Sequence, residues 1–405
     1  MTSMSTSTQQ PSRIYTFQFG LLCLSSLLFF FSFSMIIPEL PDYLSGLGGE
    51  AYKGLIISLF TATAALSRPF SGKLTDLIGR KPVMYFGAVV CIVCSLLYPL
   101  LSTIVGFLFL RLIHGFSTGF TPTAVAALVA DIVPAHKRGE AMGIWGLSSN
   151  IGTAMGPALG STLVQWFSIE WMFYASALAA VLSISILLNI KETLLEKYSF
   201  RLQMLRIHRD EVIEKRVFPA ALMMMTGVFG FGVVLTLIPD YSKALGIANK
   251  GLFFTFLTVS SFLVRFIAGK VSDKYGRLKV LYASSIVLIV AYSYLAMAQS
   301  AGQLFTGACL LGVAIGMHSP TVIAWTIDLS LEERRGRGMG TTYIAMEIGI
   351  GTGALVAGWL YGNQISHLPY PFWVSAGVVL VGFLSLLLFY NKRFTRTSAT
   401  QKEKD

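Results

Sequence analysis

Two charged residues lie deep inside apolar runs of this 405-residue chain. At the rise of 1.5 Å per helical residue, Arg111 lies about 10 Å from one end of its run and Glu347 about 13 Å from one end of its own. A charge at mid-bilayer costs at least about 2.5 kcal/mol, so each should face the protein interior or a water-filled cavity and have a partner. Because burial favours a protonated carboxyl group, Glu347 could exchange protons or bind a cationic substrate. Arg111 could tune proton movement or bind anionic groups. A static hydrogen bond to a neighbouring Ser or Thr is the alternative for both.

Other residues with possible chemistry also lie in apolar runs. His114 and His318 could titrate in a cavity, but a lone buried histidine is more often a neutral hydrogen-bonding residue. Cys91-x-x-Cys94 has no second pair and no His or carboxylate beside it, so we predict two helix-packing residues and no metal site. The sequence also has no phosphate-binding Gly loop and no metal-ligand cluster, which argues against an enzyme and an ATP-driven pump.

The composition places these residues in a membrane protein. Hydrophobic residues make up 54% of the chain, charged residues only 13%, and the mean hydropathy is +0.67. The net charge of +11 does not indicate nucleic-acid binding, because Lys and Arg lie between apolar spans. We predict twelve transmembrane helices, near residues 14–37, 52–72, 83–101, 104–128, 140–163, 169–190, 217–241, 249–271, 279–299, 302–326, 338–361 and 370–391.

Lys and Arg also predict the orientation. Alternate connections between the apolar runs are basic, and the longest of them is the linker 191–216. By the positive-inside rule, the linker and the two tails, 1–13 and 392–405, should lie in the cytoplasm. No N-x-Ser/Thr glycosylation site is present, which is consistent with a bacterial inner membrane as the plasma membrane concerned.

A polar run between two apolar segments occurs twice, which indicates a duplicated unit. Six helices in each half keep the same orientation, so we predict an all-α fold of two parallel six-helix repeats, 14–190 and 217–391. Glu347 is not duplicated, since its counterpart in the first half is Asn150. At an offset of 197 residues, Arg68, Gly72, Asp76, Gly79, Arg80 and Asp131 recur as Arg265, Gly269, Asp273, Gly276, Arg277 and Asp328.

This duplicated architecture resembles the major facilitator superfamily over nearly the whole chain. The first apolar run ends in Pro38-x-x-Pro41, similar to a signature of the drug/proton antiporter branch, and Arg111 resembles the arginine of the family's fourth helix. The fifth run is similar to the family's antiporter motif, with Ser161 where a final glycine is usual. The motif residues are Gly143, Gly152, Gly156, Pro157 and Gly160.

The resemblance implies a latch that holds the halves closed on the cytoplasmic face. Arg80 should pair with Asp131, Asp76 should face the N-terminal end of the eleventh helix, and Gly72 and Gly79 should allow tight turns. Asp273, Arg277 and Asp328 should repeat the latch in the second half. The resemblance also implies that the glycines of the fifth helix contact the eighth helix and prevent leakage. Charges that only fix topology and glycines that only pack helices are the alternatives.

We therefore predict a secondary active transporter that works by alternating access and exports a small organic compound or drug in exchange for protons. The proton gradient would supply the energy without a cofactor, and the protein would act as a monomer in the lipid bilayer. An importer or uniporter of a sugar or metabolite is the alternative within this class, and a multi-pass membrane enzyme is the alternative outside it. No carboxylate lies in the middle of the first helix, where some drug/proton antiporters carry one, and no pattern identifies the substrate.

Overall fold

The structure is a computed structural model that describes residues 15–134, 137–194, 197–207, 212–331 and 334–402, so the predicted tail 1–13 lies outside it. Within these ranges, twelve long helices are present, as the apolar runs predict. The helices of the first half are α1 (Phe17–Met35), α3 (Lys53–Leu77), α4 (Arg80–Leu97), α5 (Ile104–Ile132), α6 (Arg138–Trp166) and α7 (Ile169–Leu188). Those of the second half are α9 (Phe218–Ala244), α10 (Leu252–Tyr275), α11 (Arg277–Ala296), α12 (Ala301–Leu329), α13 (Arg335–Tyr361) and α14 (Pro369–Lys402).

Proline interrupts the chain where the first helix ends. Pro38 and Pro41 have no amide hydrogen to donate, so α1 gives way to a 3-10 turn at Ile37–Glu39 and then to the short helix α2 (Leu40–Gly46). The last helix, in contrast, is longer than predicted. It continues from 391 to Lys402, because this stretch contains no Gly or Pro to end it. Other 3-10 turns lie at Glu50–Tyr52, Leu202–Leu205, Lys215–Val217 and Ile365–His367.

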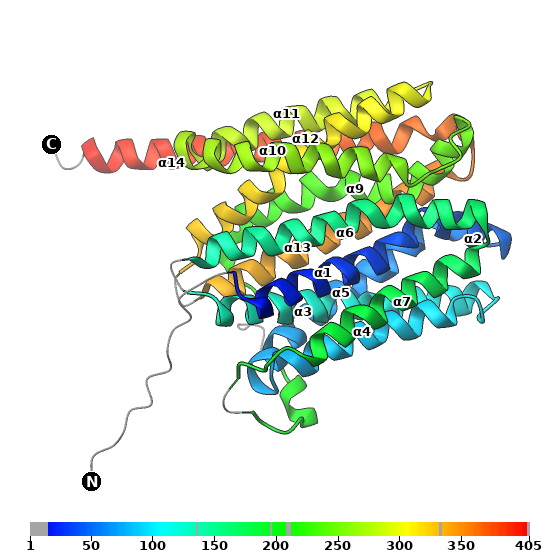
Figure 1. The fold of residues 1–405 in the computed structure, drawn as a ribbon. Helices are drawn as coiled ribbons and strands as arrows, with labels where there is room; N and C mark the ends of the chain where they lie inside the picture. The colour runs from blue at the N-terminus through cyan, green and yellow to red at the C-terminus, as the bar shows by residue number, and fades with distance from the viewer. Residues whose placement is uncertain (1–14, 135–136, 195–196, 208–211, 332–333, 403–405) are drawn as a thin grey trace, which may run out of the picture.

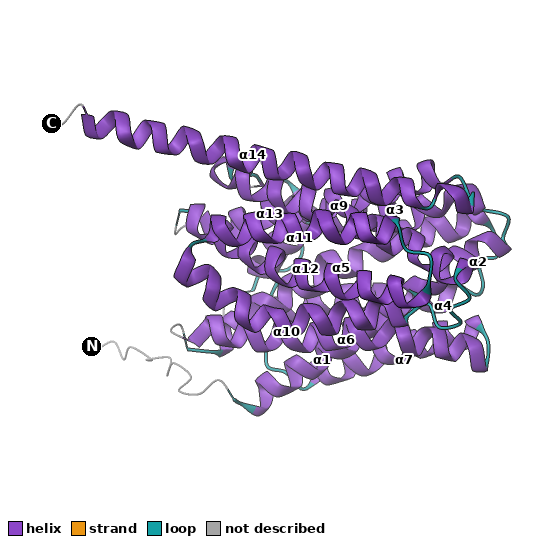
Figure 2. Cartoon of the chain, turned by 90° about the horizontal axis from the view of Figure 1, so that it is seen from above, coloured by secondary structure: helices purple, strands orange, loops and turns teal. Residues whose placement is uncertain are grey.

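The long helices lie side by side along one common direction (Figure 1). The view from above shows the same arrangement, with the C-terminal part of α14 extending past the other helices (Figure 2). The start of α1 and the linker lie near one end of the bundle, which we call the linker end, and α2 lies near the other, which we call the α2 end (Figure 1).

Nine helical segments of the described chain are long and apolar enough to cross a membrane, and α10 is a tenth if its 44° bend lies within one span. The two remaining long helices are α3 and α6. These two helices also join the halves, since α3 contacts α13 and α6 contacts α10. Small and polar residues on α3 and α6 allow this close approach, and they lower the hydropathy of both helices.

Candidate functional site

An ion pair joins the two halves in the middle of the bundle. The Arg68 guanidinium of α3 donates to a carboxylate oxygen of Glu347 on α13 at 2.5 Å, and the two side chains are only 13% and 7% exposed. The guanidinium also lies over the ring of Tyr343, 4.9 Å from the ring centre. Glu347 therefore has the partner that its depth requires. The sequence pattern does not identify Arg68 as that partner, and only its recurrence as Arg265 sets it apart.

Between this ion pair and the α2 end, small residues bring the halves into contact. A Cβ added to Gly54 of α3 would lie 2.7 Å from the carbonyl oxygen of Ala354 on α13. On the other side of the bundle, a Cβ added to Gly251, just before α10, would lie 2.1 Å from the carbonyl oxygen of Pro157 on α6. The contacts are backbone to backbone, so both helix pairs are closed at the α2 end.

Toward the linker end, the facing surfaces separate. Gly54, Thr61 and Arg68 lie on one face of α3, and Gly72 is the next residue of that face. A Cβ added to Gly72 would meet no atom within 4 Å. The halves are thus in contact at the α2 end and apart at the linker end. A Cβ would likewise meet no atom within 4 Å on Gly143 and Gly146 of α6, on Gly269 of α10, and on Gly336 and Gly340 of α13.

Further ion pairs cross between the halves at the α2 end. Lys53 of α3 lies 2.7 Å from Asp240 of α9. Lys250, 197 residues after Lys53, lies 2.6 Å from Asp42 of α2 and 2.8 Å from Glu39. We call these five residues the α2-end clamp. The repeat marks both lysines, Asp42 and Asp240 in the sequence, but only the fold shows that each lysine reaches an acid of the opposite half.

At the linker end, the charges of the predicted latch are paired within each half. Arg80 donates to Asp131 at 3.0 Å and to Asp76 at 3.1 Å. Arg277 likewise donates to Asp328 at 2.9 Å and pairs with Asp273. The prediction that Asp76 faces the start of α13 is wrong for this conformation. Its side chain is 75% exposed and lies beside Arg80, because the halves are apart at this end.

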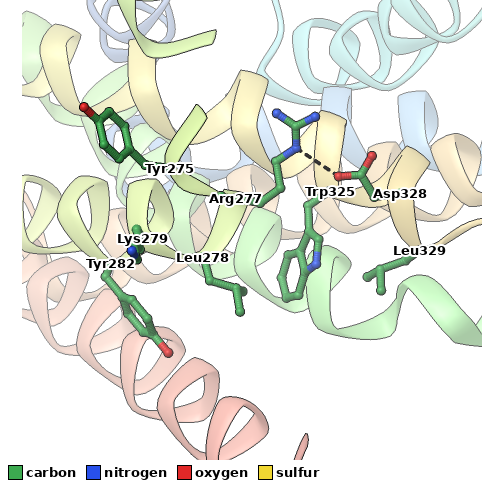
Figure 3. A pocket seen from close by; sticks show the side chains of 9 residues that line it. Tyr275, Arg277, Leu278, Lys279, Tyr282, Trp325, Asp328 and Leu329 are labelled. Atoms are coloured by element: carbon green, nitrogen blue, oxygen red, sulfur yellow. Dashed lines mark hydrogen bonds and ion pairs between the residues drawn. The ribbon is translucent and has the colours of Figure 1, made fainter. Parts of the chain in front are cut away.

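A pocket of about 600 Å³ lies beside the Arg277–Asp328 ion pair (Figure 3). Trp325 and Tyr282 form part of its wall, and the Tyr282 ring makes an edge contact with Phe383 of α14. All the residues that line it belong to α10, α11, α12 and the turn between α10 and α11. The pocket therefore lies within the second half and is not a passage between the halves.

Two glycines of the repeated motif shape the turns after α3 and α10. Gly79 has a φ of 112° and Gly276 a φ of 93°, values that residues with a side chain rarely adopt. Gly72 and Gly269, in contrast, lie inside α3 and α10. The turn expected at Gly72 is therefore wrong, because the helix ends only where the backbone reaches the positive φ of Gly79.

Glu192 of the linker caps the N-terminal end of α4. Its carboxylate accepts hydrogen bonds from the backbone amides of Arg80 at 3.2 Å and Lys81 at 3.0 Å, and also from those of Thr193 and Leu194. Burial alone would raise the pKa of this carboxyl group. The four amide hydrogen bonds outweigh burial and lower its pKa.

Glu192→Ala is expected to destabilise the protein by about 1 kcal/mol at neutral pH, the usual cost of a lost helix cap. The folded pKa is lowered, so this stabilisation is present above the unfolded pKa of about 4.3 and is lost as the pH falls through the lower folded value. Thermal unfolding of wild type and variant between pH 7 and pH 3 measures the effect, with the exposed Glu50→Ala as control. A loss of stability that stays the same at every pH would contradict this role.

Arg111 lies inside the first half, away from Glu347. It is 2% exposed, its Nε donates to the Ile56 carbonyl oxygen at 2.8 Å, and its guanidinium lies 4.6 Å from the centre of the Phe60 ring. Its remaining contact is the Tyr98 hydroxyl at 3.4 Å. No acidic side chain of the described residues pairs with Arg111. These neutral partners on α3 and α4 favour a structural role for this residue.

Both buried histidines are hydrogen-bonded within their own halves. His318 Nε2 lies 3.0 Å from the Met223 carbonyl oxygen, and Nδ1 lies 3.0 Å from the Ser284 hydroxyl. A carbonyl oxygen only accepts, so Nε2 carries a proton. The Ser284 hydroxyl beside Nδ1 also donates to the Leu281 carbonyl oxygen at 3.1 Å. His114 is held by the Tyr98 hydroxyl at 3.1 Å and by the sulfur of Cys91 at 3.4 Å. These contacts favour the neutral hydrogen-bonding alternative for both.

The glycines of the antiporter motif face α1 rather than the eighth helix, which is α10. Cβ atoms added to Gly152 and Gly160 would each lie 2.2 Å from an α1 carbonyl oxygen, and one on Gly156 would also meet α1. The contact with α10 instead uses Pro157 and its neighbours, on a different face of α6, and a Cβ added to Gly143 would meet no atom within 4 Å. The implied glycine contact with the eighth helix is therefore wrong, since residues four apart share one helix face and that face is taken by α1.

Ser161 connects α6 to the α2-end clamp. Its hydroxyl donates to Glu39 at 2.6 Å, and Glu39 in turn binds Lys250. The corresponding residue of the second half is Gly358, which lies against Gly54. The serine at the end of the motif thus replaces a close backbone contact with a hydrogen bond to a buried carboxylate.

Comparison with known proteins agrees with this architecture. The chain matches the Major Facilitator Superfamily over residues 22–248 and again over 217–405. It is 28% identical to a multi-drug resistance efflux pump PmrA homolog of Lactococcus lactis subsp. lactis, over 82% of this chain and 85% of the relative. It is 27% identical to the multidrug resistance protein MdtG of Enterobacter lignolyticus, over 86% of each chain.

A solved structure has the same fold. The crystal structure of a D-xylose-proton symporter matches with a TM-score of 0.75 at 15% identity, over 91% of this chain and 96% of that one. The family model therefore matches both halves of the chain, and the fold of the solved structure covers both halves as well. The protein is an integral membrane transporter, and it belongs to the Major Facilitator Superfamily.

Proposed function

We propose that this secondary transporter exports small organic compounds by alternating access, in exchange for protons. Support comes from the relatives named as multidrug efflux pumps, which align with most of the chain. The Lys and Arg distribution supports a cytoplasmic linker and cytoplasmic termini in a bacterial inner membrane. The present conformation, apart at the linker end, would then receive a compound from the cytoplasm. The protein would work as a monomer.

The observation that carries the proposal is the ion pair between Arg68 and Glu347. Every other acidic residue of the described helices lies within two turns of a helix end, whereas Glu347 is in the middle of α13. Protonation of Glu347 would remove its charge and weaken its bond to Arg68. Proton binding would thereby loosen the contact between α3 and α13 that joins the halves. This links the proton to the conformational change that alternating access requires.

Purified protein in liposomes with an acidic lumen tests this proposal. Norfloxacin or ethidium added outside is expected to raise the lumenal pH, reported by trapped pyranine, because each compound that enters exchanges for protons. Protein-free liposomes are the control for passive leakage. Accumulation of D-xylose without proton movement, and no response to either drug, would instead favour the importer or uniporter of a sugar.

A further inference from the structure

Arg265 of α10 is the repeat counterpart of Arg68, but it has no acidic partner. In the part of the chain that the structure describes, no hydrogen bond or ion pair reaches its side chain, and its Nε is buried without a partner. A guanidinium inside a membrane protein is costly unless something compensates its charge. Arg265 therefore differs from Arg111, whose guanidinium is satisfied by a carbonyl oxygen and a hydroxyl.

The register of the helices identifies the residue that stands opposite Arg265. On one side of the bundle, Gly54 of α3 meets Ala354 of α13, and one turn further Ser58 lies against Gly351. On the other side, the equivalent Gly251 and Thr255 of the α10 segment meet Pro157 and Ala154 of α6. All these contacts repeat at the offset of 197 residues. The two helix pairs thus share one register.

The next contact in this register explains the missing partner. Where α3 and α13 place Arg68 against Glu347, α10 and α6 place Arg265 level with Asn150. Asparagine can donate and accept hydrogen bonds, but it carries no charge to neutralise a guanidinium. The repeat therefore contains two arginines and one carboxylate at this level, and a positive charge remains on the α10 side.

Other polar groups lie close to this charge. Tyr343 of α13, one turn before Glu347, lies 4.9 Å from the Arg68 guanidinium and also interacts electrostatically with Arg265. Gly269, Gly146 and Gly143 lie between this level and the linker end, and a Cβ added to any of them would meet no atom within 4 Å. The uncompensated guanidinium lies where the closed part of the interface ends, so a solute from the linker end can approach it.

We propose that Arg265, together with Asn150 and Tyr343, binds the carboxylate group of an organic anion, and that such anions are among the transported compounds. The guanidinium can form two parallel hydrogen bonds to a carboxylate, and the ligand thereby supplies the negative charge that Asn150 lacks. Tyr343 can donate a further hydrogen bond. A membrane potential that is negative inside would assist export of an anion. The proposal rests on the proposed function, because it names the class of compound exported.

Isothermal titration of the purified full-length protein with 2-naphthoate and with its neutral amide, 2-naphthamide, tests the site. The carboxylate is expected to bind about 10- to 100-fold more tightly than the amide, the range of charge-assisted hydrogen bonds. Arg265→Gln should remove this preference and leave the affinity for the amide unchanged. Lys274→Gln removes an exposed cation of the same helix and should keep the preference. Equal affinities for the two compounds in the wild type would overturn the proposal.

A second variant keeps the test decisive if Arg265→Gln is poorly folded. Asn150→Glu recreates in the first half the pair that Glu347 makes in the second. It should raise the melting temperature by neutralising Arg265 and abolish the preference for 2-naphthoate. A stabilised variant that still prefers the carboxylate would refute the assignment.

Binding and transport fail separately in these experiments. If 2-naphthoate binding depends on Arg265 but no compound moves protons across liposomes, the anion site stands and proton-coupled export is wrong. If norfloxacin or ethidium exchanges for protons and Arg265→Gln changes neither transport nor the carboxylate preference, export stands and the anion site is wrong.

Discussion

Glu347→Gln is expected to reduce transport driven by a pH gradient by at least about 100-fold, because glutamine cannot take up and release the proton that couples the halves. The lumenal pH of liposomes, followed with pyranine while a compound is added, measures this loss. Glu170→Gln is the matched control, since Glu170 is an exposed acid whose described contact is the neighbouring Ser168. Undiminished pH-driven transport by Glu347→Gln would eliminate Glu347 as the coupling residue.

The same substitution separates coupling from stability. Glu347→Gln leaves the buried Arg68 without its partner, which destabilises the fold by about 3–5 kcal/mol. The double variant Arg68→Gln/Glu347→Gln removes both charges and should recover most of the melting temperature. It should still not couple transport to protons. If the double variant regains pH-driven transport, the loss in the single variant came from misfolding and not from the missing proton site.

Asp240→Asn is expected to shift the protein away from the conformation that is closed at the α2 end. In this variant Lys53 stays buried in the clamp without its carboxylate, at a cost of about 3–5 kcal/mol in the closed state only. Opening would return Lys53 to water, so the ratio of closed to open molecules should fall by about 100-fold or more. Lys250→Gln should act in the same direction, because it leaves Glu39 without its lysine and Asp42 with only Lys243, 3.7 Å away.

Spin labels on two exposed alanines, Ala51 in the first half and Ala248 in the second, report the separation of the halves at the α2 end. The distance distribution between them should move to longer values in Asp240→Asn and stay as in the wild type in Glu170→Gln. An unchanged distribution in both Asp240→Asn and Lys250→Gln would mean that the backbone contacts at Gly54 and Gly251 hold this end closed without the clamp.

The membrane fold and its internal symmetry follow from sequence alone. In lipid, a spanning segment must satisfy its backbone hydrogen bonds internally, so each long apolar run becomes a helix whatever surrounds it. The resemblance to the family also implies the pairs Arg80–Asp131 and Arg277–Asp328, each of which lies within one half. The motif also predicts the turn at Gly79, where the backbone has a positive φ that favours glycine.

Contacts between the halves could not be predicted in this way. Hydropathy does not identify which helices pack against each other. Any polar residue at the depth of Glu347 could therefore be its partner. The spacing of the α6 glycines has the same limit, because it identifies one face of the helix but not the helix that packs against that face. Asp76 does not face the start of α13 because the halves are apart at the linker end.

Only the packed bundle decides that the halves meet through α3 with α13 and α6 with α10, in one register. That register brings together side chains from opposite halves, pairs Arg68 with Glu347, and leaves Arg265 opposite an asparagine. The physical reason is that an ion pair depends on distances of a few ångströms, which tertiary packing sets and the spacing of residues along the chain does not.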